Sequence, residues 1–293
     1  MEDIKQNIKE LYLSDTIPWI VGYSGGKDST ATLQLIWESL SELDKSKLHK
    51  KIHVLTNDTL VENPIVSMWV EESLKQIDIE SKKQNLPFIT HMTVPEVNDS
   101  FWVNLIGRGY PAPRPRFRWC TQRLKINPAN KYVLDVVNEH GEAIMVLGTR
   151  KSESTARKRV IEKHEGSTRS MLSRNHDPQF DRVWIYAPIK EWSNDEVWEY
   201  LATHSNPWKY DNGDLINMYR GATKDKECPM VVDSSTPSCG DSRFGCYVCT
   251  LVDKDKSMSA MIINDDEKKW MSPLADFRNK YLDVKNDHQH REF

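Results

Sequence analysis

The chain has 293 residues, of which 38% are hydrophobic and 28% are charged, and its formal net charge is -3 at pH 7. This composition is typical of a folded globular protein and excludes a disordered chain. The near-neutral charge gives no sign, over the whole molecule, of a nucleic-acid binder. The polar N-terminus lacks the features of a secretory signal, and no run approaches the ~18 apolar residues that span a bilayer. We therefore expect a cytoplasmic protein with no membrane partner.

Short apolar runs alternate with helical patterns over the first two thirds of the chain. The runs cover residues 19–23, 52–57, 87–94, 143–148 and 183–187. Apolar residues recur at helical spacing in residues 29–43 and 68–83. Runs without polar alternation are typical of strands buried on both faces. The sequence therefore predicts an α/β fold with a doubly wound, mostly parallel sheet, whose ligands bind at the carboxyl ends of the strands.

The amino-acid composition of the chain changes near residue 210. Residues 211–240 are rich in Gly, Pro, Ser, Asp and Lys, and they lead into a group of cysteines and a polar tail. We predict an α/β domain over residues 1–210 and a small, loop-rich cysteine module over residues 211–293. The two parts are expected to share one active site.

A glycine-rich loop follows the first predicted strand and opens the next helix. It consists of Ser24, Gly25, Gly26, Lys27, Asp28 and Ser29. Small residues let the backbone approach an anion, and the helix N-terminus offers free N–H groups. Lys27 adds positive charge, and Asp28 suits a loop that also holds Mg²⁺. The loop is not a Walker A motif, because Asp28 follows the lysine. We predict that all six residues bind ATP and that Lys27 and Asp28 are catalytic; the plainer alternative is a serine-capped turn.

Two further segments at predicted strand ends carry candidate nucleotide ligands. Asp58 and Thr59 follow the second strand, although either could instead cap the next helix. Gly148, Arg150 and Arg157 follow the fourth strand, where arginines can clamp a phosphate, and Arg150 is also a catalytic candidate.

A later segment, residues 187–201, is expected to define the fold. Ser193 and Glu196 have the spacing of a capping box that opens a helix, and Trp198 and Leu201 are expected in the core.

Residues 100–134 contain no Asp or Glu, and basic and aromatic residues alternate there. The basic residues are Arg108, Arg114, Arg116, Arg118, Arg123, Lys125 and Lys131. Prolines at 111, 113 and 115 exclude a helix at that point. Charge and aromatic rings together suit a nucleotide or a nucleic-acid strand, and a solvated basic surface is the alternative. We predict that Arg123 and Lys125 contact the nucleotide.

Cys120 lies within this basic segment and is a candidate catalytic residue. Nearby positive charge is predicted to lower the pKa of its thiol and to favour the thiolate. Two roles stay open: a persulfide carrier or nucleophile, or a passive group beside the nucleotide.

Four cysteines near the C-terminus are candidate metal ligands. They are Cys228, Cys239, Cys246 and Cys249. In a reducing compartment such a group more often holds a metal than forms disulfides. Four thiolates suit a [4Fe–4S] cluster or tetrahedral Zn²⁺. Structural zinc sites usually draw on two close pairs, and only Cys246 and Cys249 form one, so the iron–sulfur cluster is favoured.

These motifs together resemble a known family. The string SGGKDS resembles the PP-loop signature of ATP pyrophosphatases, which have a HUP-like fold, and residues 55–64 and 148–157 resemble segments of the phosphoadenylylsulfate reductase superfamily. The strings WCTQRLK and CGDSRFGCYVCT closely resemble the DndC-type sulfurtransferases of bacterial DNA phosphorothioation, to which SspD proteins are related.

The resemblance implies that ATP, hydrolysed to AMP and pyrophosphate, activates an oxygen of the DNA backbone and that sulfur then replaces it. It also implies DNA, a cysteine desulfurase as sulfur donor and other phosphorothioation proteins as partners, and it allows a homo-oligomer.

Three other functions stay open at this point. A reductase of adenylylsulfate or its 3′-phosphate predicts a Cys-Cys pair or a C-terminal catalytic cysteine, whereas Trp119 precedes Cys120 and no cysteine follows Cys249. A tRNA thiolase shares the PP-loop and a cluster but acts on a base. A zinc-stabilised DNA-binding module that uses ATP as a switch is the non-enzymatic alternative.

Overall fold

The computed structural model describes the chain except residues 154, 156–157, 160–170, 176, 224–243 and 283–293. Two compact units are present. The sheet unit comprises Met1–Thr56, Val70–Thr93 and Ala129–Asn212. The cysteine unit comprises Asn57–Trp69, Val94–Pro128 and Gly213–Phe293. Its last segment begins near the boundary expected from the sequence, but two earlier segments also belong to it, because their apolar side chains contribute to its core.

One six-stranded sheet forms the centre of the sheet unit, in the order β3-β2-β1-β4-β6-β5. Its strands are β1 (Trp19–Gly22), β2 (Ile52–Asn57), β3 (Phe88–Thr93), β4 (Ala143–Val146), β5 (Ser173–Arg174) and β6 (Val183–Tyr186). β1 pairs in parallel with β2 and β4, and β4 pairs in parallel with β6. The predicted mostly parallel α/β sheet is confirmed, and all five apolar runs form strands. The sixth strand, β5, is a two-residue antiparallel edge strand that the sequence did not predict.

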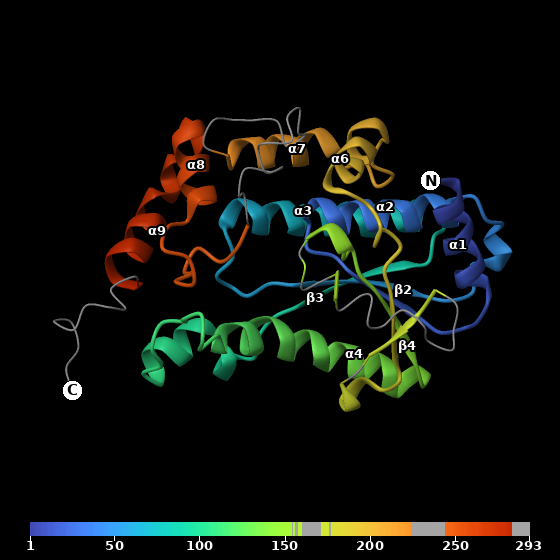
Figure 1. Cartoon of the computed structure of the whole chain (residues 1–293), viewed down its shortest axis with the longest axis horizontal. Coiled ribbons are helices and arrows are strands. Elements are labelled where there is room, and N and C mark those ends of the chain that lie inside the picture. The colour runs from blue at the N-terminus through green and yellow to red at the C-terminus, as the bar shows by residue number, and fades with distance from the viewer. Residues whose placement is uncertain (154, 156–157, 160–170, 176, 224–243, 283–293) are drawn as a thin grey trace. The chain divides into compact units, whose positions relative to one another are not determined.

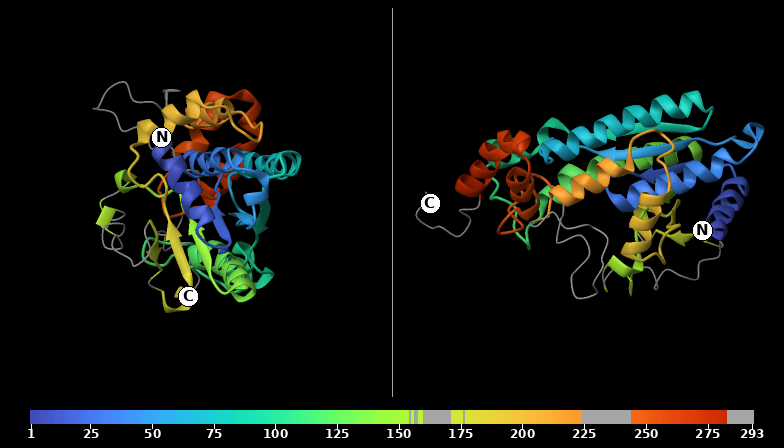
Figure 2. Two further views of the ribbon diagram at one scale, coloured as in Figure 1. Left: turned by 90° about the vertical axis from the view of Figure 1, so that its right-hand side faces the viewer. Right: turned by 90° about the horizontal axis from the view of Figure 1, so that it is seen from above.

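Helices cover both faces of this sheet. They are α1 (Glu2–Leu13), α2 (Lys27–Ser41), α3 (Pro64–Lys83), α4 (Asn127–His140) and α6 (Asn194–Thr203). Figure 1 shows α2 and α3 on one face and α4 on the other. At the far end of α2, Lys5 of α1 forms ion pairs with Glu38 and Glu42, and Figure 2 shows the two helices together. Among the helices described, none combines the length and apolar character needed to cross a membrane.

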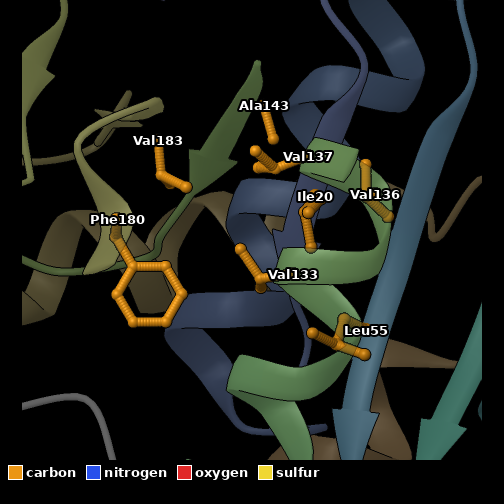
Figure 3. Close-up of a cluster of buried hydrophobic side chains, with 8 residues drawn as sticks. All are labelled: Ile20, Leu55, Val133, Val136, Val137, Ala143, Phe180 and Val183. Atoms are coloured by element: carbon orange, nitrogen blue, oxygen red, sulfur yellow. The ribbon is translucent and has the colours of Figure 1, made fainter. Parts of the chain in front are cut away.

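The core between α4 and the sheet follows directly from the two periodicities. Val133, Val136 and Val137 lie on one side of α4 and pack against residues of the parallel strands β1, β2, β4 and β6 (Figure 3). The strand side of this cluster consists of Ile20, Leu55, Ala143 and Val183, with Phe180 beside them. Each fully buried aliphatic side chain stabilises the fold by about 1.5–3 kcal/mol.

On the opposite face α2 is buried along most of its length. Trp37 of α2 stacks on Phe88 of β3 with ring centroids 4.5 Å apart. This packing fixes the position of α2, and therefore of the loop that precedes it.

The predicted capping box of α6 is confirmed. The Ser193 hydroxyl accepts a hydrogen bond from the Glu196 backbone N–H, and the Glu196 carboxylate accepts one from the Ser193 N–H. Trp198 and Leu201 are buried, as expected.

The cysteine unit is made of short helices and loops. Its helices are α7 (Asn212–Gly221), α8 (Lys256–Asn264) and α9 (Ser272–Phe277), with π-helical turns at Val103–Gly107, Thr121–Ile126 and Arg278–Leu282. Short 3₁₀ turns lie at Val97–Asp99 and Asp266–Met271 in this unit. In the sheet unit, short 3₁₀ turns lie at Lys45–Lys47, Lys151–Glu153 and Pro178–Phe180. Residues from three separate segments form the core of the cysteine unit: Val61, Phe101, Trp119, Leu124, Val248 and Leu282.

A buried histidine in the sheet unit predicts a dependence of stability on pH. The Nδ1 atom of His53, in β2, lies 2.7 Å from the Tyr132 hydroxyl oxygen. Its Nε2 atom has no hydrogen-bond partner among the described residues. Burial, with a contribution from His140, lowers the pKa of His53 to about 4. Because the folded pKa lies below the unfolded value, the unfolded chain binds the extra proton, and the fold loses stability as the pH falls from about 6.5 towards 4.

We expect the free energy of unfolding to fall by about 1–2 kcal/mol more in the wild type than in His53→Asn between about pH 7 and pH 5. Urea denaturation at the two pH values measures this difference. His49→Asn, at an exposed histidine, is the control and is expected to match the wild type. Equal losses in the wild type and His53→Asn would contradict the prediction.

Candidate functional site

The predicted phosphate loop connects β1 to α2 at the carboxyl end of β1. Strand order reverses here, because β2 lies on one side of β1 and β4 on the other, and such a switch point is where doubly wound sheets bind ligands. Gly25 has a φ of +70°, a conformation that favours glycine. Gly26 is the N-cap residue of α2 and makes no side-chain cap. The end of α2 is therefore built to receive an external acceptor such as a phosphate.

Two serine hydroxyl groups hold the loop closed. The Ser29 Oγ donates to the Gly26 carbonyl at 3.0 Å and accepts from the Ser24 backbone N–H at 3.2 Å. The two hydroxyl oxygens of Ser24 and Ser29 lie 3.1 Å apart. Both hydroxyl groups can exchange these local partners for phosphate oxygens.

Lys27, Asp28 and Arg150 form one charged network beside the loop. The Lys27 Nζ lies 2.9 Å from Oδ2 of Asp28, and the Arg150 Nε donates to Oδ1 of Asp28 at 2.8 Å. Arg150 is buried, and its Nη1 also donates to the Ser152 hydroxyl. The structure thus brings together three of the residues predicted to be catalytic, with two cations on one carboxylate.

The donor set at Asp28 fits the Mg²⁺ ion that the sequence implies. Each carboxylate oxygen is engaged by one cation and has a second acceptor site left. Mg²⁺ in phosphate sites is typically held by one or two carboxylates together with the phosphates themselves. Asp28 would supply the protein's share of such a site.

Gly148 has a packing role that the sequence did not suggest. A Cβ at this position would lie 2.7 Å from the Asp28 carbonyl oxygen and 3.0 Å from the Thr32 Oγ1. The residue therefore lets the end of β4 approach the first turn of α2, where the charged network lies.

Gly148→Ala is expected to displace the first turn of α2, because backbone at 2.7 Å cannot yield to a methyl group. We expect a destabilisation of about 1–3 kcal/mol and a weaker affinity for ATP. Thermal unfolding and ATP titration measure the two effects. Gly221→Ala, where a Cβ meets nothing within 4 Å, is the control. Wild-type stability and affinity in Gly148→Ala would refute the packing role.

Within the cysteine unit, Cys246 pairs with the segment that follows β2. Glu62 and Cys246 form an antiparallel bridge, and the flanking backbone bonds are Tyr247 N–H to Val61 O at 3.0 Å and Asn63 N–H to Gly245 O at 3.1 Å. The Thr59 hydroxyl lies 3.4 Å from the Cys246 sulfur and donates to the Glu62 carboxylate at 3.0 Å. Thr59, predicted to contact nucleotide, thus lies beside a cysteine.

Lys125 and Glu62 form an ion pair near the Cys246 and Cys120 thiols. The Lys125 Nζ lies 3.2 Å from Oε1 of Glu62. Burial opposes the charge of Lys125, but Glu62 and the Cys246 and Cys120 thiols raise the pKa of its ammonium group above the usual value. Lys125 is therefore a fixed positive charge among the cysteines.

The prediction that Cys120 has a lowered pKa was wrong. Burial raises the pKa of its thiol, and the neighbouring Cys249 adds to the rise. The positive charge expected from Arg123 is neutralised elsewhere, because its guanidinium group forms an ion pair with Asp99 and bonds to the Tyr110 hydroxyl. Burial also raises the pKa of Cys246, to about 12, with a further contribution from Glu62.

The Cys246–Cys249 segment is held by residues that sequence reasoning missed. The Cys249 N–H donates to the Cys246 carbonyl at 3.0 Å. Arg278 is almost fully buried and donates to the carbonyl groups of Cys249, Val252 and Asp253. No local pattern indicates the role of Arg278, because the backbone oxygens that it binds lie 25 to 29 positions away. Glu62 lies within residues 55–64, the segment that resembles the reductase superfamily. The sequence did not indicate its ion pair with Lys125 or its pairing with Cys246.

The other predicted residues are placed as follows. The Asp58 carboxylate accepts the Leu60 backbone N–H at 2.8 Å and so shapes the loop after β2. Arg157, Cys228 and Cys239 lie outside the described residues. In the part of the chain that is described, no three His, Cys, Asp or Glu side chains are arranged to hold a metal ion. Cys246 and Cys249 supply two of the four predicted thiol ligands, and their chemistry fits an iron–sulfur cluster or zinc.

The sequence is similar to a known domain family and to a protein from an archaeon. Residues 18–252 match the phosphoadenosine phosphosulfate reductase domain family. The uncharacterized protein MJ0066 of Methanocaldococcus jannaschii is 28% identical over 209 residues, covering 70% of this chain and 36% of that protein. The chain thus spans about a third of the length of this relative.

Two solved structures that are similar to part of this chain have low sequence identity to it. A phosphoadenylyl-sulfate reductase from Candida auris is 12% identical, with a TM-score of 0.39 over 68% of this chain and 78% of that one. The U34-tRNA thiolase NcsA from Methanococcus maripaludis is 14% identical, with a TM-score of 0.41 over 77% and 74%. Because the family match covers most of the sequence, the chain belongs to the phosphoadenosine phosphosulfate reductase domain family.

Proposed function

We propose that the protein is an ATP-dependent sulfurtransferase that hydrolyses ATP to AMP and pyrophosphate to activate the DNA backbone for phosphorothioate modification. The observation that supports this most is the loop at the end of β1, where Lys27 and buried Arg150 converge on Asp28. The cysteine string at 239–250, which resembles that of DndC-type enzymes, supports sulfur and DNA as the other reactants.

The residues of the loop would bind and polarise the triphosphate. Backbone N–H groups at Gly25 and Gly26 and the Lys27 ammonium group would hold phosphate oxygens. Arg150 would stabilise charge at the α-phosphorus, and its hydrogen bonds to Ser152 and the Trp192 carbonyl would fix its orientation. Mg²⁺, held in part by Asp28, would neutralise charge on the departing pyrophosphate.

The reaction would proceed in two displacements. A non-bridging oxygen of a DNA phosphodiester attacks the α-phosphorus of ATP, and pyrophosphate leaves. Sulfur at the oxidation level of hydrosulfide then attacks the DNA phosphorus, and AMP leaves with the original oxygen. A cysteine desulfurase and a thiol reductant would supply this sulfur.

The cysteine unit would carry the sulfur chemistry. Cys228, Cys239, Cys246 and Cys249 would hold a [4Fe–4S] cluster, which supplies a site for sulfur when bound. Lys125, fixed by Glu62, would balance the negative charge of nearby thiolates. Cys120 would then serve as a persulfide carrier or as a neighbour of the cluster.

Reduction of adenylylsulfate or its 3′-phosphate is the second candidate, because the matching family is described by that activity. It requires a cysteine nucleophile beyond the cluster ligands, and Cys120 is the one cysteine of the sequence outside the predicted set. Release of sulfite and AMP from adenylylsulfate by the purified protein, with a thiol reductant supplying the two electrons, would favour this candidate.

Mass spectrometry of DNA dinucleotides tests the proposed function in cells that carry the partner proteins. Phosphorothioate is expected with the wild-type chain and with Lys82→Ala, which removes an exposed Lys–Asp pair. It is expected to be absent with Lys27→Ala. Unchanged phosphorothioate levels in Lys27→Ala cells would remove the proposal.

A further inference from the structure

A tight turn lies in the middle of the acid-free segment of the cysteine unit. The Arg114 N–H donates to the Phe117 carbonyl at 3.1 Å, and the Phe117 N–H donates to the Arg114 carbonyl at 2.8 Å. Pro115 and Arg116 are the two central residues, and proline presets the backbone angle that a turn requires at its position. The turn over residues 114–118 therefore has a defined shape.

The base of this turn is anchored to the core of the cysteine unit. The Trp119 indole N–H donates to the Pro111 carbonyl at 3.0 Å, and the Trp119 ring stacks on Phe101 with centroids 5.4 Å apart. The Thr250 hydroxyl donates to the Pro113 carbonyl at 2.7 Å and is fully buried. Thr250 thus holds the residues before the turn and Phe101 holds the residue after it, so the tip of the turn has a fixed orientation.

The tip exposes one aromatic ring between two arginines. Phe117 is 46% exposed, and Arg116 and Arg118 are exposed. Among the described residues, none forms an ion pair or hydrogen bond with the guanidinium group of Arg116 or Arg118. Arg123, in contrast, is bound internally to Asp99 and Tyr110. No interaction within the described fold accounts for this combination of side chains.

We propose that the 114–118 turn binds single-stranded DNA, with the Phe117 ring stacked on an unpaired base and Arg116 and Arg118 against the flanking phosphates. The choice of DNA rests on the proposed function. A single strand is favoured over a duplex because base faces are accessible to a ring only when the base is unstacked. Arg116 and Arg118 lie in residues 100–134, a segment without Asp or Glu. They supply the positive charge that complements the DNA phosphates.

Fluorescence anisotropy with the full chain and an oligodeoxythymidylate of about 20 nucleotides tests this inference. Base stacking on one ring implies that Phe117→Ala weakens binding by about 5- to 100-fold, and that Phe117→Trp retains it. Loss of two phosphate contacts in the double variant Arg116→Ala/Arg118→Ala is expected to reduce the slope of log affinity against log salt by about 1.4. The controls are Trp270→Ala, at an exposed aromatic residue, and the double variant Arg174→Ala/Arg182→Ala, which removes two exposed arginines of the sheet unit.

Wild-type affinity in Phe117→Ala and in the Arg116→Ala/Arg118→Ala variant would overturn the inference, as would equal losses in the controls. If Phe117→Ala loses affinity for duplex and single-stranded DNA equally, the inference is also overturned, because the ring is then not stacked on an unpaired base. Tighter binding of RNA of the same sequence would overturn the assignment to DNA. These outcomes are independent of ATP cleavage, so a protein that binds the strand through this turn but never forms phosphorothioate would refute only the proposed function.

Discussion

Lys27→Ala is expected to lower the rate of pyrophosphate release from ATP by about 100-fold or more, the usual cost of removing one group that stabilises transition-state charge. The Lys27 Nζ lies 2.9 Å from Oδ2 of Asp28, at the start of α2, and its side chain is only 13% exposed. The substitution removes the cation nearest the loop but leaves the Arg150 bond to Asp28 in place. The fold is therefore expected to remain, and a coupled pyrophosphate assay measures the loss.

The control for this variant is Lys82→Ala. Lys82 forms a similar ion pair, with its Nζ 2.6 Å from Oδ2 of Asp78, but the pair lies on the exposed side of α3. Pyrophosphate release in Lys82→Ala is expected to match the wild type. If Lys27→Ala retains full activity while it folds normally, the loop does not bind the triphosphate in the way described.

Cys246→Ser and Cys249→Ser are each expected to remove most of the iron from anaerobically purified protein, together with its absorbance at about 400 nm. A serine oxygen is a poor ligand for iron–sulfur clusters, and both cysteines lie on a segment fixed by Arg278 and by pairing with Glu62. Metal analysis and absorption spectra measure the effect. Cys120→Ser, outside the predicted ligand set, shows whether Cys120 also contributes.

Val252→Ala is the control within the same segment, because Val252 is 47% exposed and interacts with Arg278 through its backbone carbonyl. It is expected to retain the iron content of the wild type. Wild-type protein that holds about one zinc and no iron would contradict the cluster and favour a structural zinc site.

Much of the sheet unit was predictable because its signals are local. Strands buried on both faces are mostly apolar and rich in β-branched residues, so ranges such as Trp19–Gly22 and Ile52–Asn57 stand out in the sequence. The two-residue strand β5 has no such signal, because it pairs along one edge only. The turn at 24–29 between β1 and α2 was predictable for the same reason, because its conformation depends on consecutive small residues.

The cysteine unit was less predictable because it depends on contacts between distant segments. Val61, Trp119 and Val248 share one core although nearly 190 positions separate the first from the last, as the printed sequence shows. The pKa of Cys120 is governed by burial, which the sequence of its neighbours does not report. The buried Arg278 and the role of Gly148 likewise arise from packing and backbone approach.

The identity of the nucleotide product tests the central claim most directly. Purified wild-type protein would be incubated with DNA, a sulfur donor, Mg²⁺ and ATP labelled at the α-phosphorus, and the products separated. Cleavage at the α-phosphorus by the loop between β1 and α2 predicts labelled AMP in equal amount to pyrophosphate, with no ADP. Labelled ADP with inorganic phosphate, or no Mg²⁺-dependent turnover of ATP with DNA and sulfur donor present, would contradict the account.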